Sequence, residues 1–114
     1  MNDREWTERI RKLLPLDIEA AVSEIVGFSN YAKEYDGAET FLLELARYPD
    51  SNVKGISILG LGHLARVHGK TSTQAVEVVR IALNNPDSYV AGHADSAADD
   101  IEQFTKNRVR QNDL

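Results

Sequence analysis

The sequence predicts an all-α protein, a short α-solenoid of six helices arranged as three antiparallel pairs. The first observation is an internal repeat, because residues 49–55 and 86–92 share five of seven residue types at a spacing of 37 positions. The second is a weaker upstream copy, in which residues 25–28 resemble residues 58–61 at a spacing of 33 positions. The third is the apolar residues after each copy, which recur every three or four positions as on one helix face. About three such repeats are needed for a stable stacked array.

Six helices are expected along the chain. We place them at residues 3–13, 18–35, 38–47, 51–68, 74–84 and 88–105. The second begins after Asp17, which aligns with Asp50 of the middle copy, and the third covers the apolar stretch at 41–46. Gly37 and Gly69 are expected to end the second and fourth helices, because glycine readily adopts the left-handed conformation at a helix C-terminus.

The fourth and sixth helices begin at equivalent turns. Asp50 and Asp87 each follow a proline and place a carboxylate where it accepts hydrogen bonds from the first turn and faces the positive end of the helix dipole. The fifth segment, residues 76–83, is rich in β-branched residues and would also suit a strand. The capping pair Thr71 and Gln74, together with the length of the segment, favours a helix.

The repeat resembles the HEAT family over residues 17–105, with a helix, a Pro-Asp turn and a valine two or three residues into a second helix. The run LGLGHLAR at 59–66 and the run PDSYVAGHADSAADDI at 86–101 are similar to those of small bacterial HEAT-like proteins. The resemblance implies that residues 1–114 form a single HEAT-like domain that serves as a platform for other macromolecules. Residues 106–114 are polar, and we expect them to form a frayed tail.

The composition excludes several kinds of protein. Thirteen Lys and Arg against 18 Asp and Glu give a net charge of −5, which argues against direct nucleic-acid binding because such proteins carry a basic face. Cysteine is absent, which removes thiolate nucleophiles and cysteine-ligated metals. The apolar runs are too short to span a membrane, and residues 1–14 lack the core of a signal peptide. We therefore expect a cytoplasmic protein without a cofactor.

Two glycine-containing motifs fit structural roles better than nucleotide binding. Residues 60–65 match G-x-G-x-x-A, but Arg80 stands where an acidic residue is needed and no βαβ pattern surrounds the motif. We expect its two glycines to let neighbouring helices approach closely. Residues 68–72 end like a phosphate-binding loop, but Leu64 stands where that motif requires glycine.

Three polar residues form a candidate chemical site. His63 aligns with Asp100 at the repeat spacing, and His93 lies seven residues before Asp100 on the same helix face. A His–Asp–His group can bind a metal or act as a general base. No nucleophile of matching spacing and no further ligand accompanies it. We therefore favour a partly buried histidine that is satisfied by one carboxylate hydrogen bond, and expect neither a metal nor a catalytic site.

The last helix carries the most informative charges. No Lys or Arg occurs between Arg80 and Lys106, and the acidic residues of this segment carry a charge of −5. They are Asp87, Asp95, Asp99, Asp100 and Glu102. Those at 95, 99 and 102 form one stripe, which aligns with apolar positions of the middle copy. The aligned residues are Ile58, Gly62 and Ala65. The stripe fits a polar cap on the array and also an acidic surface for a basic partner, and the two roles are compatible.

A second acidic stretch lies at residues 17–44, where seven carboxylates accompany a single basic residue, Lys33. Tyr31 and Tyr35 lie in this stretch. Tyrosine is a common anchor of protein interfaces and also a common packing residue between helices. We take these two tyrosines, together with Tyr89, as candidate partner contacts.

These features favour a non-enzymatic protein-binding module. The chain resembles, in size, acidity and lack of a catalytic set, the immunity proteins of contact-dependent inhibition systems, which neutralise a toxin domain. We expect such an immunity protein, with a basic toxin domain as its partner. The alternatives are an adaptor or scaffold in a cytoplasmic assembly and an enzyme that uses His63, His93 and Asp100. The expected partner contacts are Asp95, Asp99, Asp100, Glu102, His63, His93, Tyr89, Tyr31 and Tyr35.

Overall fold

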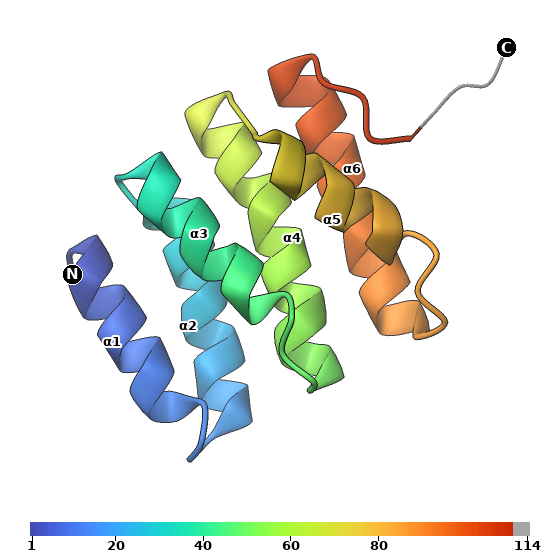
Figure 1. The fold of residues 1–114 in the computed structure, drawn as a ribbon. Coiled ribbons are helices and arrows are strands. Elements are labelled where there is room, and N and C mark those ends of the chain that lie inside the picture. The colour runs from blue at the N-terminus through green and yellow to red at the C-terminus, as the bar shows by residue number, and fades with distance from the viewer. Residues whose placement is uncertain (111–114) are drawn as a thin grey trace, which may run out of the picture.

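Six α-helices and no strand make up the regular structure of residues 1–110, which are the residues that the computed structural model describes (Figure 1). The helices are α1 (Asp3–Leu13), α2 (Ile18–Tyr31), α3 (Tyr35–Leu45), α4 (Ser51–His68), α5 (Thr73–Ala82) and α6 (Ser88–Thr105). The prediction of six helices is confirmed, and the expected bounds of α1, α4 and α6 match. The apolar segment that also suited a strand is helical from Thr73 to Ala82, but its N-cap is Ser72, whose hydroxyl accepts from the N–H of Ala75, and not the predicted Thr71.

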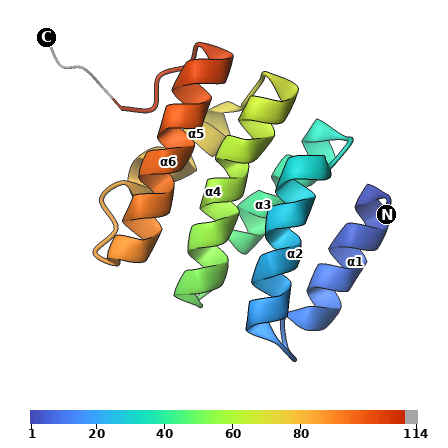
Figure 2. The same cartoon turned by 180° about the vertical axis from the view of Figure 1, so that it is seen from behind.

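The helices form two layers in a slab of 47 × 30 × 17 Å. Helices α2, α4 and α6 lie side by side, and α3 and α5 lie across one side of them, with α1 beside α2 at one end (Figures 1 and 2). Helix α4 is central and contacts α2, α3, α5 and α6. The core lies between the layers, and its largest fully buried side chains include Phe28, Leu42, Leu64, Val79 and Ile101.

Aspartates start three of the helices as the sequence predicts. The Asp50 carboxylate accepts hydrogen bonds from the N–H groups of Asn52 and Val53 at 2.8 and 3.1 Å. The carboxylates of Asp17 and Asp87 accept from the first turns of α2 and α6 in the same way. These contacts satisfy backbone donors that have no partner within a helix.

The end of α2 differs from the prediction. Gly69 ends α4 in the left-handed conformation, with φ of 68°, as expected, but Gly37 lies inside the first turn of α3. Helix α2 instead ends at Tyr31, because the carboxylate of Asp3 in α1 accepts hydrogen bonds from the N–H groups of Lys33 and Glu34 at 2.9 and 2.8 Å. A contact from a distant helix therefore stabilises this turn.

Two glycines of α4 permit close helix contacts. A Cβ added at Gly62 would lie 2.7 Å from the Cα of Ala97 in α6, and one added at Gly60 would lie 3.0 Å from the Cβ of Ser29 in α2. Both distances are shorter than ordinary van der Waals contact. The expectation that these glycines let neighbouring helices approach is confirmed.

The segment after α6 does not fray at residue 106 as expected. Residues 107–110, which we call the C-terminal strap, turn back beside α6 (Figure 1). Val109 is 0% exposed, and its carbonyl accepts a hydrogen bond from Nε of Arg80 in α5 at 2.9 Å. Burial of this apolar side chain holds the strap. The remaining part of the predicted tail, residues 111–114, lies outside the described residues. No helix within residues 1–110 is both long enough and apolar enough to cross a membrane.

Candidate protein-binding surfaces

Helices α2, α4 and α6 lie in front of α3 and α5 in Figure 2, which shows the side of this layer that points away from α3 and α5. On this side the sequence places a mixed apolar and polar stripe. Its residues recur every three or four positions along each helix, as expected for one helix face. We call this stripe the outer face, and it comprises Val26, Asn30, Leu59, His63, Arg66, Val67, Tyr89, His93, Asp100 and Phe104. The structure thus brings together four of the residues that the sequence singled out, one from α4 and three from α6.

His63 lies at the centre of the outer face. Its Nδ1 is 3.0 Å from Oγ of Ser29 and 3.4 Å from Nδ2 of Asn30, both in α2. The Asn30 carbonyl oxygen in turn accepts a hydrogen bond from the Arg66 guanidinium at 2.5 Å. The sequence led us to expect the Asp100 carboxylate of α6 as the partner of the imidazole. The structure instead places the imidazole against a serine hydroxyl of α2.

Neighbouring charges nevertheless act on His63. Burial lowers the pKa of the imidazole below its usual value, and the positive charge of Arg66 lowers it further. The carboxylate of Asp100 opposes this shift, while His93 adds to it. The neutral imidazole is therefore favoured, and a neutral imidazole offers a partner one donor or one acceptor. Within residues 1–110 no three His, Asp or Glu side chains are arranged to hold a metal ion.

His93 and Tyr89 form a second unit of the outer face. Their rings pack edge to face with centroids 4.4 Å apart. They lie against Gly55 of α4, where an added Cβ would come within 2.7 Å of the Tyr89 ring and 3.1 Å of His93. Burial lowers the pKa of His93 as well. Gly55 therefore lies directly beneath the two rings. The one sequence signal that marked this glycine was its repetition as Gly92 at the 37-residue spacing.

The two tyrosines of the N-terminal half differ in environment. Tyr31 is 73% exposed at the end of α2 and is free to contact a partner. The hydroxyl of Tyr35 donates to the buried carboxylate of Glu39, and its ring packs edge to face on His68. Burial raises the pKa of Tyr35, and the Glu39 carboxylate adds to this effect. Tyr35 therefore serves the packing of α3 against the end of α4.

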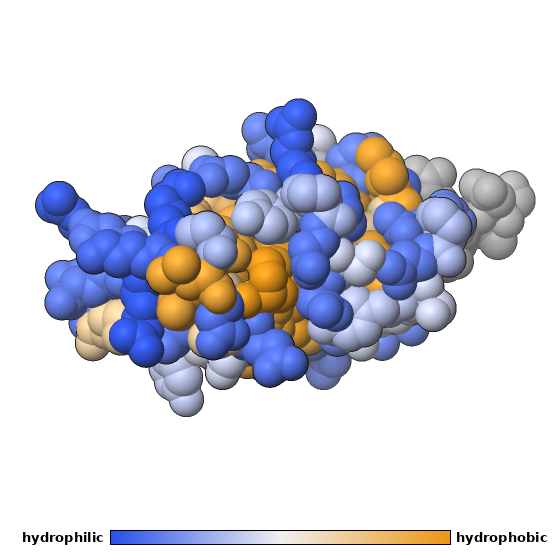
Figure 3. Space-filling view, turned by 90° about the horizontal axis from the view of Figure 1, so that it is seen from below, coloured by the Kyte–Doolittle hydropathy of each residue, from blue (hydrophilic) through white to orange (hydrophobic). Residues whose placement is uncertain are grey.

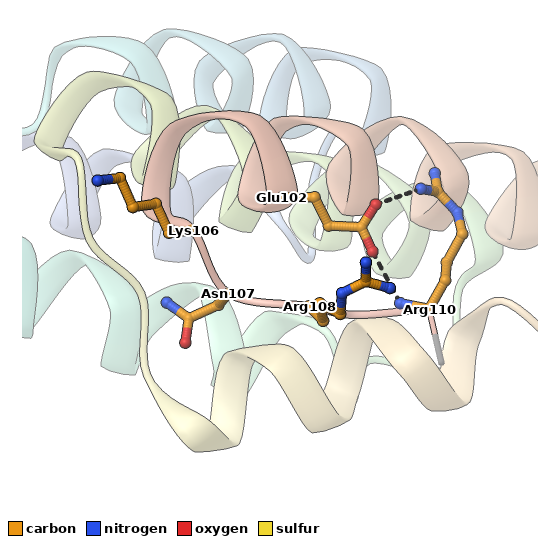
Figure 4. A pocket seen from close by; sticks show the side chains of 5 residues that line it. All are labelled: Glu102, Lys106, Asn107, Arg108 and Arg110. Atoms are coloured by element: carbon orange, nitrogen blue, oxygen red, sulfur yellow. Dashed lines mark hydrogen bonds and ion pairs between the residues drawn. The ribbon is translucent and has the colours of Figure 1, made fainter. Parts of the chain in front are cut away.

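The acidic stripe of α6 is occupied by the chain itself (Figure 4). We call Asp95, Asp99 and Glu102 the acidic edge. The guanidinium of Arg110 lies 3.2, 2.6 and 2.6 Å from their carboxylate oxygens. Burial raises the pKa of Glu102, but the N–H groups of Arg110 and Val109 and the charge of Arg110 lower it more, so that the net shift is downward. Asp100, the fourth predicted acidic contact, lies apart from this edge on the outer face.

Ion pairs join α1 to its two neighbouring helices. Arg11 of α1 binds the Glu44 carboxylate of α3 at 2.6 and 3.0 Å and lies 4.8 Å from the centre of the Phe41 ring. Arg9 binds Glu24 of α2 at 2.6 Å. Within the described part of the chain no ion pair involves an outer-face residue. The polar groups of the outer face are instead held by the hydrogen bonds that join His63 to Ser29 and Arg66 to Asn30.

Another apolar area is visible in the space-filling view, where it runs toward the middle of the molecule and is bordered by hydrophilic side chains (Figure 3). Leu16 in the α1–α2 turn is 81% exposed. The contacts of this area define no polar recognition group, so it is a weaker candidate than the outer face.

Comparison of the chain with protein-family models, with curated proteins and with solved structures found no match. The function is therefore argued from the arrangement of the residues.

Proposed function

We propose that the chain is a non-enzymatic protein-binding module and that the outer face is its binding surface. The distribution of exposed apolar side chains carries this proposal. Five large apolar side chains within helices are exposed, and three of them, Val67, Tyr89 and Phe104, lie on the outer face with 40% to 48% of their surface accessible. The other two are Tyr31 at the end of α2 and Ile81 on α5. Exposed aromatic side chains beside half-buried hydrogen-bonding groups are typical of interface anchors.

The proposed architecture is a short HEAT-like array of three helix pairs, α1–α2, α3–α4 and α5–α6. The register between α4 and α6 supports it. Gly62 lies against Ala97, and Ser51, which begins α4, is near enough to the Asp87 carboxylate that caps α6 to lower the pKa of that carboxyl. Equivalent turns of the two copies thus lie side by side. In such an array the second helix of each pair contributes to one continuous surface.

The proposed partner is a basic protein. The charge argument rests on the whole chain, whose net charge is −5, because the outer face itself carries one carboxylate, Asp100, and one guanidinium, Arg66. Opposite charge accelerates association and helps to select a partner. We propose that the chain is an immunity protein that neutralises a basic toxin domain, and the alternative is a scaffold that joins components of an assembly.

Capture with matched variants tests the binding surface. The parent chain, the double variant Tyr89→Ala/Phe104→Ala and the control variant Ile81→Ala are immobilised and exposed to a lysate of the source cell. Ile81 is a suitable control because it is 68% exposed but lies on α5. The partner is the protein that the parent and the control retain and the double variant loses. With the purified pair, the double variant should bind at least about tenfold more weakly. Equal binding by all three chains would refute the outer face as the binding surface.

Expression of the captured partner distinguishes the two functions. A toxin should arrest growth when expressed alone, and co-expression of the parent chain should restore growth while the Tyr89→Ala/Phe104→Ala variant should not. A partner that is harmless alone supports the scaffold. Turnover of a substrate by the purified chain would instead revive the enzyme hypothesis built on His63, His93 and Asp100.

A further inference from the structure

We propose that the groove between α5 and the acidic edge of α6 is a second binding site, which takes a basic extended segment of a partner protein in which an apolar residue precedes an arginine. The C-terminal strap occupies this groove as a tethered competitor. The proposal concerns a different surface from the outer face and stands independently of it. Three kinds of contact define what the groove recognises.

The first contact is apolar. Val109 is fully buried, although it lies in a segment without helical structure. Its N–H is bound by Glu102 of α6 and its carbonyl by Arg80 of α5, so the side chain lies between these two helices. Burial of one aliphatic side chain gives the bound segment a fixed register along the groove.

The second kind of contact is made to the main chain. One carboxylate oxygen of Glu102 accepts from the N–H groups of Val109 and Arg110 at 3.0 and 2.9 Å. Arg80 donates to the carbonyl of Val109 at 2.9 Å, and both carboxylate oxygens of Glu77 accept from Arg80 at 3.2 Å. The strap contributes only backbone groups to its contacts with Glu102 and Arg80. Any extended segment can therefore make the same contacts.

The third contact selects arginine. Three carboxylates converge on the Arg110 guanidinium, which also donates to the backbone carbonyl of Asp95 at 2.9 Å. A planar guanidinium presents several donors in a fixed geometry and can satisfy three acceptors at once, whereas a lysine ammonium is a point charge. Three carboxylates against one guanidinium leave the bound groove with a charge of −2 (−3 + 1), which favours additional basic residues in a partner segment.

The strap fits this groove less well than a free segment would. Lys106 joins it to α6 with φ of 64°, and within residues 1–110 it is the one non-glycine residue with positive φ. Left-handed backbone is unfavourable for a lysine, and a partner segment needs no such reversal. An open hollow of about 390 Å³ beside the strap is lined by Glu102, Lys106, Asn107, Arg108 and Arg110 (Figure 4). The strap therefore does not fill the space between itself and α6.

Competition in the full-length chain tests the proposal. The probe is a fluorescent peptide with the sequence of residues 106–110, Lys-Asn-Arg-Val-Arg, and binding is followed by anisotropy to the parent and to the Arg110→Ala variant. If the strap is docked for about nine-tenths of the time, it weakens the apparent affinity of the parent about tenfold. We therefore expect at least about tenfold tighter binding to Arg110→Ala. A probe with Val109→Asp should not bind.

Two further variants complete the test. Adding Asp99→Asn to Arg110→Ala should abolish most of the gain in affinity, because it removes a carboxylate that holds the arginine of the probe. Circular dichroism checks that each variant is folded, and if Arg110→Ala is not, Val109→Ala replaces it as the variant with a loosened strap. Equal affinity of the probe for the parent and the loosened variant, or no binding to either at millimolar concentration, would overturn the proposal. Neither result depends on the outer-face variants.

Discussion

Helices α4 and α6 have 18 residues each and equivalent starting turns, but the edge that α4 turns toward α6 differs from the edge that α6 turns toward the strap. At this edge α4 carries Ile58, Gly62 and Ala65, which are buried. At the equivalent positions α6 carries Asp95, Asp99 and Glu102, which bind the strap through Arg110. Three substitutions thus change an edge that packs against a helix into an edge that binds a basic segment.

The inward sides of the same two helices remain alike. Leu64 and Ile101 occupy equivalent positions and are both almost fully buried. Other buried positions differ in size, since Leu61 of α4 aligns with Ala98 of α6, but the change from apolar to acidic residues lies at the free edge, where binding is proposed. A repeat protein can vary such an edge while its core residues preserve the fold.

The largest effect is expected where the two helices are alike. Leu64→Ala and Ile101→Ala should each lower the free energy of unfolding by about 2–5 kcal/mol, because each leaves a cavity in the core. Urea unfolding measures this loss. Leu16→Ala is the matched control, since Leu16 is 81% exposed and its truncation should cost less than about 0.5 kcal/mol. A loss well below 1 kcal/mol at either core site would mean that the two helices do not share this packing.

A smaller effect is expected at the edge of α4. Gly62→Ala should destabilise the protein by about 1–3 kcal/mol through overpacking against Ala97, in spite of the better helix propensity of alanine. Gly92→Ala in α6 is the control, because nothing lies within 4 Å of a Cβ added there. It should stabilise the chain by up to about 1 kcal/mol. The same sign of change in both variants would contradict the close contact between α4 and α6.

The equivalent caps Asp50 and Asp87 should both stabilise the folded chain by accepting hydrogen bonds from the first turn of a helix. Asp50→Ala should cost about 1 kcal/mol in thermal or urea unfolding, because two N–H groups of α4 lose their acceptor, whereas Asp50→Asn should nearly preserve stability. At Asp87, the Ser51 side chain and a hydrogen bond from the Tyr89 N–H lower the pKa below its ordinary 3.8. The contribution of this carboxylate to stability is therefore present above pH 3.8 and is lost as the pH falls through the folded value. Full stability of Asp50→Ala at neutral pH would exclude the capping role.

The smallest expected effect is the pH dependence of the free energy of unfolding that arises from His63 on the outer face. Burial lowers the pKa of His63, so the unfolded chain binds a proton at higher pH than the folded chain. The free energy of unfolding should thus fall as the pH drops from 6.5 through the folded pKa. His63→Asn should remove part of this decline, and Asp100→Asn should steepen it because Asp100 favours the charged imidazole. Parallel stability curves from pH 7 to pH 5 for all three chains would disprove this linkage.

Local signals were sufficient to predict much of the fold. Asp50, Asp87 and Gly69 mark helix ends by chemistry that involves only neighbouring residues, and the 37-residue repeat aligns α4 with α6. Gly37 misled the prediction because the end of α2 depends on Asp3, which lies about 30 residues earlier in the chain. A hydrogen bond between distant helices has no local sequence pattern.

The candidate surfaces were predicted only in part. The stripe at Asp95, Asp99 and Glu102 was visible in the sequence, but its ligand, Arg110, reaches it only through the reversal at Lys106. Alternating basic residues at 106, 108 and 110 directly after an acidic helix are the sequence signal from which this contact could have been inferred. His63 was expected to bond to Asp100 in α6, and it instead bonds to Ser29 in α2, since helix alignment predicts neighbouring helices but not the choice of side-chain rotamer.

The contact between Arg110 and the acidic edge is the central difference between α4 and α6, and a double-mutant cycle measures it directly. The cycle compares urea unfolding of the parent, Arg110→Ala, Glu102→Ala and the double variant. Because the two side chains share one network of hydrogen bonds, we predict a coupling energy of at least about 0.5 kcal/mol. Additive effects of the two substitutions within about 0.3 kcal/mol would show that the strap is not held by this edge.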